Sequence, residues 1–271
     1  MKMFALQPLP GAWDFDVADE MVDWARAHGK RVRGHTLVYG QQLPWWISGR
    51  LWTRDELLEV MKDHITTVMR HFSGRVAEWD VVNEAIDQDG SFVPNLWYQV
   101  IGPSYVKRAF RFAHAADPSA KLFYNDNGID VVDNPHTVGV RNLVAGLRSG
   151  GVPIDGVGSQ SHVSNRFNGG EAPFAASLRS FADLGLDVAV TEMDVRLDGE
   201  GTPDQKLATQ RQAFSDAAQA CRLEPRCTSF TTWGISDRYS WLGPAAAPLL
   251  FDEGLQPKPA FAAVDDWVHG P

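Results

Sequence analysis

The sequence predicts an α/β fold built on a parallel sheet, and three observations support this prediction. Apolar runs of strand length alternate along the chain with longer segments whose apolar residues recur at helical spacing. Several of the apolar runs are continuous, as in parallel strands that are buried on both faces. Polar residues such as histidine, asparagine, glutamine and glutamate follow many of these runs directly, which places them at the carboxyl ends of the predicted strands.

Six strand-like runs are present, at residues 31–38, 76–83, 121–125, 154–160, 187–192 and 229–234. Helical patterns accompany them at 17–28, 53–71, 104–116, 138–148, 172–184, 204–220 and 259–268. Thr53 and Glu56 form a capping-box pattern at the start of the second helix. Because no repeat or low-complexity tract divides the chain, we expect residues 1–271 to form a single domain.

Two arrangements of such a sheet compete, an open doubly wound sheet and a closed barrel. The open sheet usually carries a glycine-rich phosphate loop after its first strand, and the sequence has no such loop there. Polar residues at the ends of many strands are typical of the active-site face of a barrel. We therefore expect a (β/α)8 TIM barrel, with about six of its eight strands in this chain.

The composition excludes several classes of function. With 44% hydrophobic and 22% charged residues, the chain resembles an ordinary globular protein. The net charge of −9 argues against polyanionic partners such as nucleic acids. No apolar run approaches the roughly 20 residues of a membrane-spanning helix, and the first residues lack a signal-peptide pattern. We expect no nucleic-acid partner, no membrane contact, no metal and no cofactor.

Cys221 and Cys227 are the only cysteines, and Glu224-Pro225 between them fits a turn. Two cysteines without a nearby histidine cannot make a zinc site. Their spacing allows a local disulfide, which would indicate an oxidising compartment. The spacing is equally compatible with two free thiols in a cytosolic protein.

Two glutamates carry the most specific chemical signal. Glu84 and Glu192 each lie at the end of an apolar, strand-like run, far apart in the sequence. Glycoside hydrolysis needs one carboxyl group to protonate the leaving oxygen and a second to attack the sugar or to activate water. The chain also has 10 tryptophans, whose flat faces stack well on sugar rings. This combination suggests a glycoside hydrolase.

Six motifs resemble glycoside hydrolase family 10, the endo-1,4-β-xylanases with a (β/α)8 barrel. In chain order they are Gly34-His35-Thr36-Leu37-Val38, Trp79-Asp80-Val81-Val82-Asn83-Glu84, Gly158-Ser159-Gln160-Ser161-His162, Thr191-Glu192-Met193-Asp194, Thr231-Thr232-Trp233-Gly234 with Tyr239-Ser240-Trp241, and Pro257-Lys258-Pro259-Ala260-Phe261. The resemblance implies a monomer that cleaves xylan and xylo-oligosaccharides with retention of configuration.

The resemblance also implies a role for each site residue. Glu84 would be the general acid and then the general base, and Glu192 the nucleophile. His162 would donate to Glu192, and Asp194 would hold the far side of the imidazole. The implied sugar contacts are Lys2, His35, Gln42, Asn83, Gln160, His162, Trp233 and Trp241.

Further family properties are expected from the resemblance alone. The family often has a disulfide where Cys221 and Cys227 lie, and its members are secreted, so we expect both here. The family's first strand, first helix and second strand, roughly 40–50 residues in a barrel of this kind, would precede Met1. An incomplete barrel of this sort would be marginally stable.

The chain departs from the family pattern at two places. The third-strand motif usually continues with Trp-His, and here it continues with Tyr39-Gly40. The fifth-strand motif usually reads Asn-Asp-Tyr-Asn, and here it ends with Asn127-Gly128. Both changes affect the expected binding cleft and leave the two glutamates unchanged.

Two alternatives to a xylanase stay open on the sequence. A catalytically weak or silent carbohydrate-binding barrel would follow if the missing strands left the site incomplete. A related β-1,4-glucanase would share both glutamates, because only the tolerance of the groove for a C6 hydroxymethyl group separates the two activities.

Overall fold

The computed structural model describes residues 1–165 and 170–269. These residues form two compact units, and each unit is described here by itself. The first unit comprises Met1–Asp126 and Asn142–Gly156, and the second comprises Asn127–Arg141 and Val157–Pro271. The helix α7 (Pro135–Ser149) contributes residues to both units. The prediction of a single domain stays a prediction.

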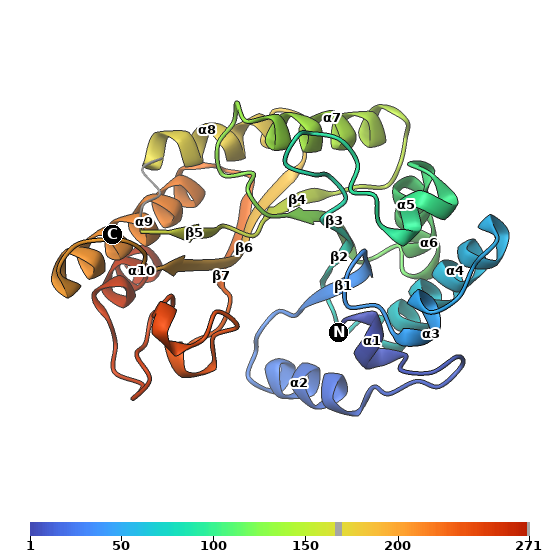
Figure 1. Ribbon diagram of the computed structural model, residues 1–271, viewed down its shortest axis with the longest axis horizontal. Coiled ribbons are helices and arrows are strands. Elements are labelled where there is room, and N and C mark those ends of the chain that lie inside the picture. The colour runs from blue at the N-terminus through green and yellow to red at the C-terminus, as the bar shows by residue number, and fades with distance from the viewer. Residues whose placement is uncertain (166–169, 270–271) are drawn as a thin grey trace. The chain divides into compact units, whose positions relative to one another are not determined.

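The first unit contains the parallel strands β1 (Arg33–Tyr39), β2 (Glu78–Asn83) and β3 (Lys121–Asp126), in that order (Figure 1). Every residue of β2 is buried, because this strand lies between its two neighbours. The register matches Tyr39 with Asn83, and Asn83 with Asn125. Three polar side chains therefore reach the carboxyl ends of adjacent strands at the same level.

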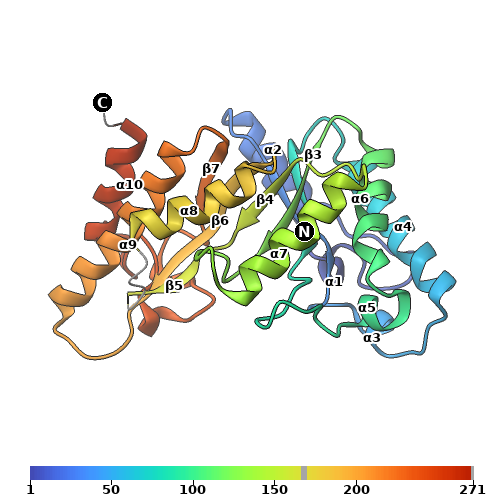
Figure 2. The same cartoon turned by 90° about the horizontal axis from the view of Figure 1, so that it is seen from above.

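Helices cover this three-stranded sheet. They are α1 (Met3–Leu6), α2 (Asp16–Ala27), α3 (Trp45–Ser48), α4 (Arg54–His71), α5 (Leu96–Ile101) and α6 (Ser104–Ala116). Helices α4 and α6 lie side by side in both views of the molecule (Figure 2). The predicted capping box of α4 is confirmed, since Thr53 Oγ1 accepts from the Glu56 N–H and the Glu56 carboxylate accepts from the Thr53 N–H.

The second unit is built around β6 (Asp187–Arg196), which pairs with β4 (Gly156–Ser159), β5 (His162–Ser164) and β7 (Cys227–Thr232). The pairing with β5 uses the last residues of β6, and the pairing with β7 uses the earlier ones. Its helices are α8 (Glu171–Ala182), α9 (Pro203–Leu223) and α10 (Pro259–His269), with the short 3₁₀ helices η1 (Asp237–Tyr239) and η2 (Pro244–Ala246). Helices α9 and α10 lie side by side (Figures 1 and 2).

All six predicted strands and all seven predicted helices are present, with shifted ends. The count of six strands is nevertheless wrong, because the structure adds β5 as a seventh. Its three residues are too few to give a periodic pattern, and it is defined only by its pairing with β6. Helices α1, α3 and α5 were missed for the same reason, since they have six residues or fewer.

The sulfurs of Cys221 and Cys227 are bonded to each other. Cys221 lies in the last turns of α9, and Cys227 is the first residue of β7. The bond therefore closes the connection between these two elements. It decides between the two alternatives that the spacing left open, and it confirms the pairing implied by the family resemblance.

Lys258 joins three segments of the second unit. Its ammonium donates to Asp237 Oδ2 at 3.0 Å and to the Ala247 carbonyl oxygen at 2.6 Å. Asp237 Oδ1 accepts from the Leu249 N–H at 2.8 Å. Both charged residues are buried, with exposed fractions of 9% for Lys258 and 3% for Asp237. Burial lowers the pKa of Lys258, and the carboxylate of Asp237 opposes this shift.

We expect Lys258→Met to destabilise the protein by about 3–5 kcal/mol, because it leaves the Asp237 carboxylate buried without a cation. Urea unfolding followed by circular dichroism measures this loss. The control is Lys30→Met, which removes the same charge from an exposed position after α2. Equal unfolding free energies for the two variants would show that the Lys258 ion pair contributes nothing.

Candidate active site

The predicted site residues fall into two clusters, one in each unit. The Glu84 cluster in the first unit contains Lys2, His35, Gln42, Asn83 and Glu84. The Glu192 cluster in the second unit contains Gln160, His162, Glu192, Asp194, Trp233 and Trp241. In the Glu84 cluster, Asn83 is the last residue of β2 and Glu84 directly follows it. In the Glu192 cluster, Gln160 and Trp233 directly follow β4 and β7.

Glu84 is the first residue after β2 and is half-buried. Its φ of 52° is in the left-handed region, which a non-glycine residue adopts at some cost. The Glu84 N–H donates to the Asn125 carbonyl oxygen at 3.0 Å, so β3 holds this turn of the chain. The Tyr39 hydroxyl donates to Glu84 Oε2 at 2.6 Å. Backbone and carboxyl group are thus each tied to a neighbouring strand.

Asn83 is buried beside Glu84, with 2% of its surface exposed. Asn125 Nδ2 donates to Asn83 Oδ1 at 2.8 Å, which fixes the orientation of the Asn83 amide. In turn, the Ala85 N–H donates to the Tyr124 hydroxyl at 2.9 Å, and that hydroxyl donates to Asp126. Burial raises the pKa of Tyr124, and the neighbouring carboxylate adds to this effect. The phenol therefore stays a hydrogen-bond donor.

His35 is held by a buried ion cluster around Asp80. The His35 Nδ1 lies 3.0 Å from Asp80 Oδ2, and the Arg33 guanidinium binds Asp80 Oδ1. Burial of Asp80 works against its charge, but Arg33 and His35 outweigh burial and hold the pKa of Asp80 below its ordinary value. The Nδ1 atom of His35 therefore already contacts Asp80, and the predicted contact of His35 with sugar would have to use another part of the ring.

Lys2 and Gln42 are the remaining two predicted residues of the Glu84 cluster. The Lys2 ammonium lies 5.7 Å from the centroid of the Tyr39 ring. Gln42 is exposed and has a φ of 51°. Their predicted contacts with sugar stay predictions.

Sequence reasoning missed the hydrogen bond from Tyr39 to Glu84. The departure from the family motif at Tyr39-Gly40 had marked this position as unusual.

Glu192 lies in the middle of β6 and is 4% exposed. His162 Nε2 lies 3.2 Å from Glu192 Oε2, and His162 Nδ1 lies 3.0 Å from Asp194 Oδ2. The register of β5 and β6 pairs His162 directly with Asp194, which brings the imidazole between the two carboxylates. This is the arrangement that the sequence predicted for these three side chains.

His162 is a cation at neutral pH. Burial lowers its pKa, but hydrogen bonds to Asp194 and Glu192 and the charges of these carboxylates outweigh burial and raise the pKa to about 9. The doubly protonated ring hydrogen-bonds Glu192 through Nε2, and its positive charge also lies against the Asp194 carboxylate.

Two tryptophans lie against this imidazole. The Trp241 ring centroid is 5.3 Å from that of His162, and the Trp233 centroid is 6.2 Å from it. Trp241 Nε1 donates to Asp194 Oδ2 at 2.8 Å, which anchors the ring although 61% of it is exposed. An exposed indole held in one orientation by a buried carboxylate presents a rigid apolar face to solvent.

Gln160 is buried directly after β4, between two serines that sequence reasoning missed. The hydroxyls of Ser159 and Ser161 donate to Asp130 Oδ1 at 2.9 and 2.6 Å. Burial raises the pKa of Asp130, against the effect of both hydroxyls. This network fixes the main chain on either side of Gln160. The two serines flank Gln160 in the motif, and this spacing is the only sequence pattern that could have indicated their role.

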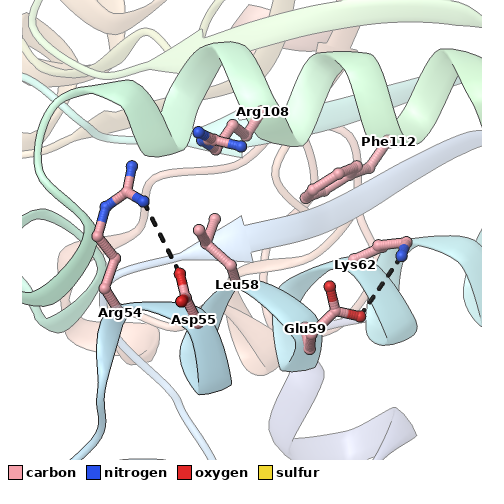
Figure 3. A pocket seen from close by; sticks show the side chains of 7 residues that line it. All are labelled: Arg54, Asp55, Leu58, Glu59, Lys62, Arg108 and Phe112. Atoms are coloured by element: carbon pink, nitrogen blue, oxygen red, sulfur yellow. Dashed lines mark hydrogen bonds and ion pairs between the residues drawn. The ribbon is translucent and has the colours of Figure 1, made fainter.

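A pocket of about 340 Å³ lies elsewhere, between α4 and α6 (Figure 3). It is lined by Arg54, Asp55, Leu58, Glu59, Lys62, Arg108 and Phe112, none of which is a predicted site residue. Ion pairs join Arg54 to Asp55 and Lys62 to Glu59 along its rim. Over residues 1–165 and 170–269, no group of three metal-ligating side chains is found, and no helix is long and apolar enough to cross a membrane.

The raised pKa of His162 makes a testable contribution to stability. Because the folded value of about 9 exceeds the unfolded value of about 6.5, the contribution is complete below about pH 6.5 and is lost as the pH rises through about 9. We expect the destabilisation by His162→Gln to be larger at pH 6 than at pH 10, by up to about 3 kcal/mol. Urea unfolding at both pH values measures it. His28→Gln, at an exposed position, is the control, and a loss that is independent of pH would contradict the assignment.

Known proteins are similar to this chain over nearly its whole length. Residues 1–267 match the family model of glycosyl hydrolase family 10. Endo-1,4-beta-xylanase B of Thermotoga neapolitana is 39% identical over 274 residues, which are 99% of this chain and 78% of the relative. The crystal structure of xylanase 10B from Thermotoga maritima matches with a TM-score of 0.94 and 40% identity, covering 98% of this chain and 83% of that one.

A second solved structure shows a bound sugar. Xylanase 10B from Thermotoga petrophila, in complex with xylobiose, also matches with a TM-score of 0.94 and 40% identity, over 98% of this chain and 82% of that one. These matches confirm the α/β fold class that the motifs implied. The chain belongs to glycosyl hydrolase family 10.

Proposed function

We propose that this protein is a retaining endo-1,4-β-xylanase that hydrolyses internal linkages of xylan with Glu84 and Glu192. The proposal is carried by the contact of Glu192 with the His162 cation, which Asp194 braces from the other side. A buried carboxylate with a fixed positive donor is suited to act as a nucleophile, because its charge is compensated and its position is set. Membership of family 10 supports the same assignment.

The first step forms a covalent intermediate. Glu84, protonated, delivers its proton to the glycosidic oxygen while a carboxylate oxygen of Glu192 attacks the anomeric carbon. The bond from the anomeric carbon to the leaving oxygen breaks, and a glycosyl ester with Glu192 forms. As the negative charge of Glu192 disappears into the ester, the His162 hydrogen bond remains to orient it. Asn83, whose amide is oriented by Asn125, is placed beside Glu84 to bind a sugar hydroxyl.

The second step regenerates the enzyme. Glu84, now a carboxylate, removes a proton from water, and that water attacks the anomeric carbon of the ester. The bond to Glu192 breaks and the carboxylate reforms beside His162. Two inversions at the same carbon give overall retention. This chemistry requires the two carboxyl groups at one glycosidic bond, roughly 5–5.5 Å apart.

Xylan is the proposed substrate because the relative from Thermotoga petrophila binds xylobiose. The exposed face of Trp241 and the half-buried ring of Trp233 suit stacking on a pyranose ring. We also propose that the protein works outside the cytosol as a monomer. The bond between Cys221 and Cys227 supports an oxidising compartment.

Reducing-sugar release from xylan tests the activity. We expect Glu192→Ala to abolish release, since it removes the nucleophile, and Glu84→Ala to lower it by about 10²–10⁴-fold, the usual share of general acid–base catalysis. Glu59→Ala, on the exposed surface of α4, serves as the control and should retain full activity.

Mixed-linkage β-glucan is the second substrate, and faster release from glucan than from xylan would favour the β-1,4-glucanase alternative. Binding of xylotetraose by calorimetry without any release would favour the silent binding protein.

The stereochemical outcome separates attack by Glu192 from attack by water. We expect the β-anomer of the new reducing end to form first, because two displacements retain configuration. Proton NMR of xylotetraose hydrolysis in the first minutes measures it. Initial appearance of the α-anomer would show a single displacement and would remove the nucleophile role from Glu192.

A further inference from the structure

We propose that Tyr39 is the positioning residue for the acid/base carboxyl group of Glu84, an inference that rests on the proposed function. The Tyr39 hydroxyl donates to Glu84 Oε2 at 2.6 Å, within the range of charge-assisted bonds from a hydroxyl to a carboxylate. The corresponding place in the motif that this chain resembles carries a tryptophan, which has no hydroxyl. In this chain, therefore, a tyrosine hydroxyl is the group at this position that contacts Glu84.

The position of Tyr39 is set by its surroundings in the first unit. As the last residue of β1, it pairs in register with Asn83, the residue before Glu84. Its carbonyl oxygen accepts from Trp97 Nε1 at 2.8 Å, and Trp97 is only 1% exposed. The ammonium of Lys2 lies 5.7 Å from the ring centroid on one side. Because these contacts restrict both the backbone and the ring of Tyr39, its hydroxyl can hold the hydrogen bond to Glu84 in one geometry.

Gly40 takes part in the same arrangement. A Cβ at position 40 would lie 2.7 Å from Cβ of Asn95, a distance that side chains do not adopt. Asn95 caps α5 by accepting the Tyr98 N–H at 3.0 Å, and α5 carries the Trp97 that binds Tyr39. The close approach of Gly40 to Asn95 thus lets α5 reach the end of β1. Gly40 and Tyr39 therefore both contact α5, one through its close approach to Asn95 and the other through Trp97.

The bond constrains how Glu84 handles its proton. The hydrogen bond to Asn125 holds the backbone of Glu84, and the Tyr39 hydroxyl contacts its carboxyl group. With Oε2 accepting from Tyr39, the proton that Glu84 delivers is carried on Oε1. In the first step, the Oε1–H bond breaks and the bond from hydrogen to the leaving oxygen forms. Tyr39 keeps its own proton throughout, and therefore acts by orientation.

Tyr39→Phe tests the proposal, because it removes the hydroxyl and keeps the ring. We expect kcat/KM for xylotetraose to fall about 10-fold, less than the full 10²–10⁴-fold contribution of acid catalysis. For dinitrophenyl β-xylobioside, whose leaving group departs without protonation, kcat/KM should stay within about twofold, because the step loses no acid catalysis. Tyr98→Phe removes a hydroxyl from a tyrosine that stacks on Phe92 and should leave both values unchanged.

The comparison of the two substrates decides the outcome. An equal fall for both substrates overturns the proposal, because it assigns Tyr39 to sugar binding or to folding.

A double-mutant cycle with Glu84→Gln guards against a purely structural effect. In that background, Tyr39→Phe should change kcat/KM by less than about twofold, because the carboxyl group that it positions is gone. A structural loss would appear in both backgrounds and would refute the assignment. If the unmodified protein released no sugar from xylan, the proposed function itself would fail, whereas activity without these Tyr39 effects would reject only the present inference.

Discussion

Parallel strand pairing is the constraint on which both clusters depend. Strands that run in the same direction bring their carboxyl ends to one edge, and the register decides which side chains become neighbours. In the first unit it sets Tyr39 beside Asn83, and Asn83 beside Asn125. In the second unit it sets His162 beside Asp194. A slip of one residue in either register would turn these side chains to the opposite face and remove the contacts.

Four of the buried carboxylates that the structure describes lie against a cationic or imidazole side chain. Asp80 has Arg33 and His35, and Asp237 has Lys258. Glu192 and Asp194 share His162. Burying an unpaired charge in an apolar interior costs free energy. These partners therefore allow acidic side chains to be buried at these positions. The chemistry proposed for Glu192 thus uses a charge arrangement that folding also requires.

At each departure from the family pattern, the residues of this chain make contacts of their own with neighbouring residues. Tyr39 brings a hydroxyl to Glu84, and Gly40 removes a side chain that would collide with Asn95. Asn127-Gly128 leads into a loop where Asn134 Nδ2 donates to the Gly128 carbonyl oxygen at 3.0 Å. Gly128 has a φ of 64°, a backbone conformation that glycine adopts without strain. The loop after β3 is therefore closed by hydrogen bonding where the family motif has an aromatic ring.

The sequence by itself determined the long helices, the six longer strands and the two glutamates, because periodicity and motif order are properties of neighbouring residues along the chain. It also predicted a contact of Asp194 with the His162 imidazole, through their place in ordered motifs. Only the tertiary structure decided the bond between Cys221 and Cys227, the strand β5, the serine network around Asp130 and the contact of Tyr39 with Glu84. Each of these depends on which segments meet in space. Strand register and helix packing set those meetings. Apart from the two cysteines, whose spacing was compatible with free thiols as well, the residues involved are too distant in the sequence for a local pattern to relate them.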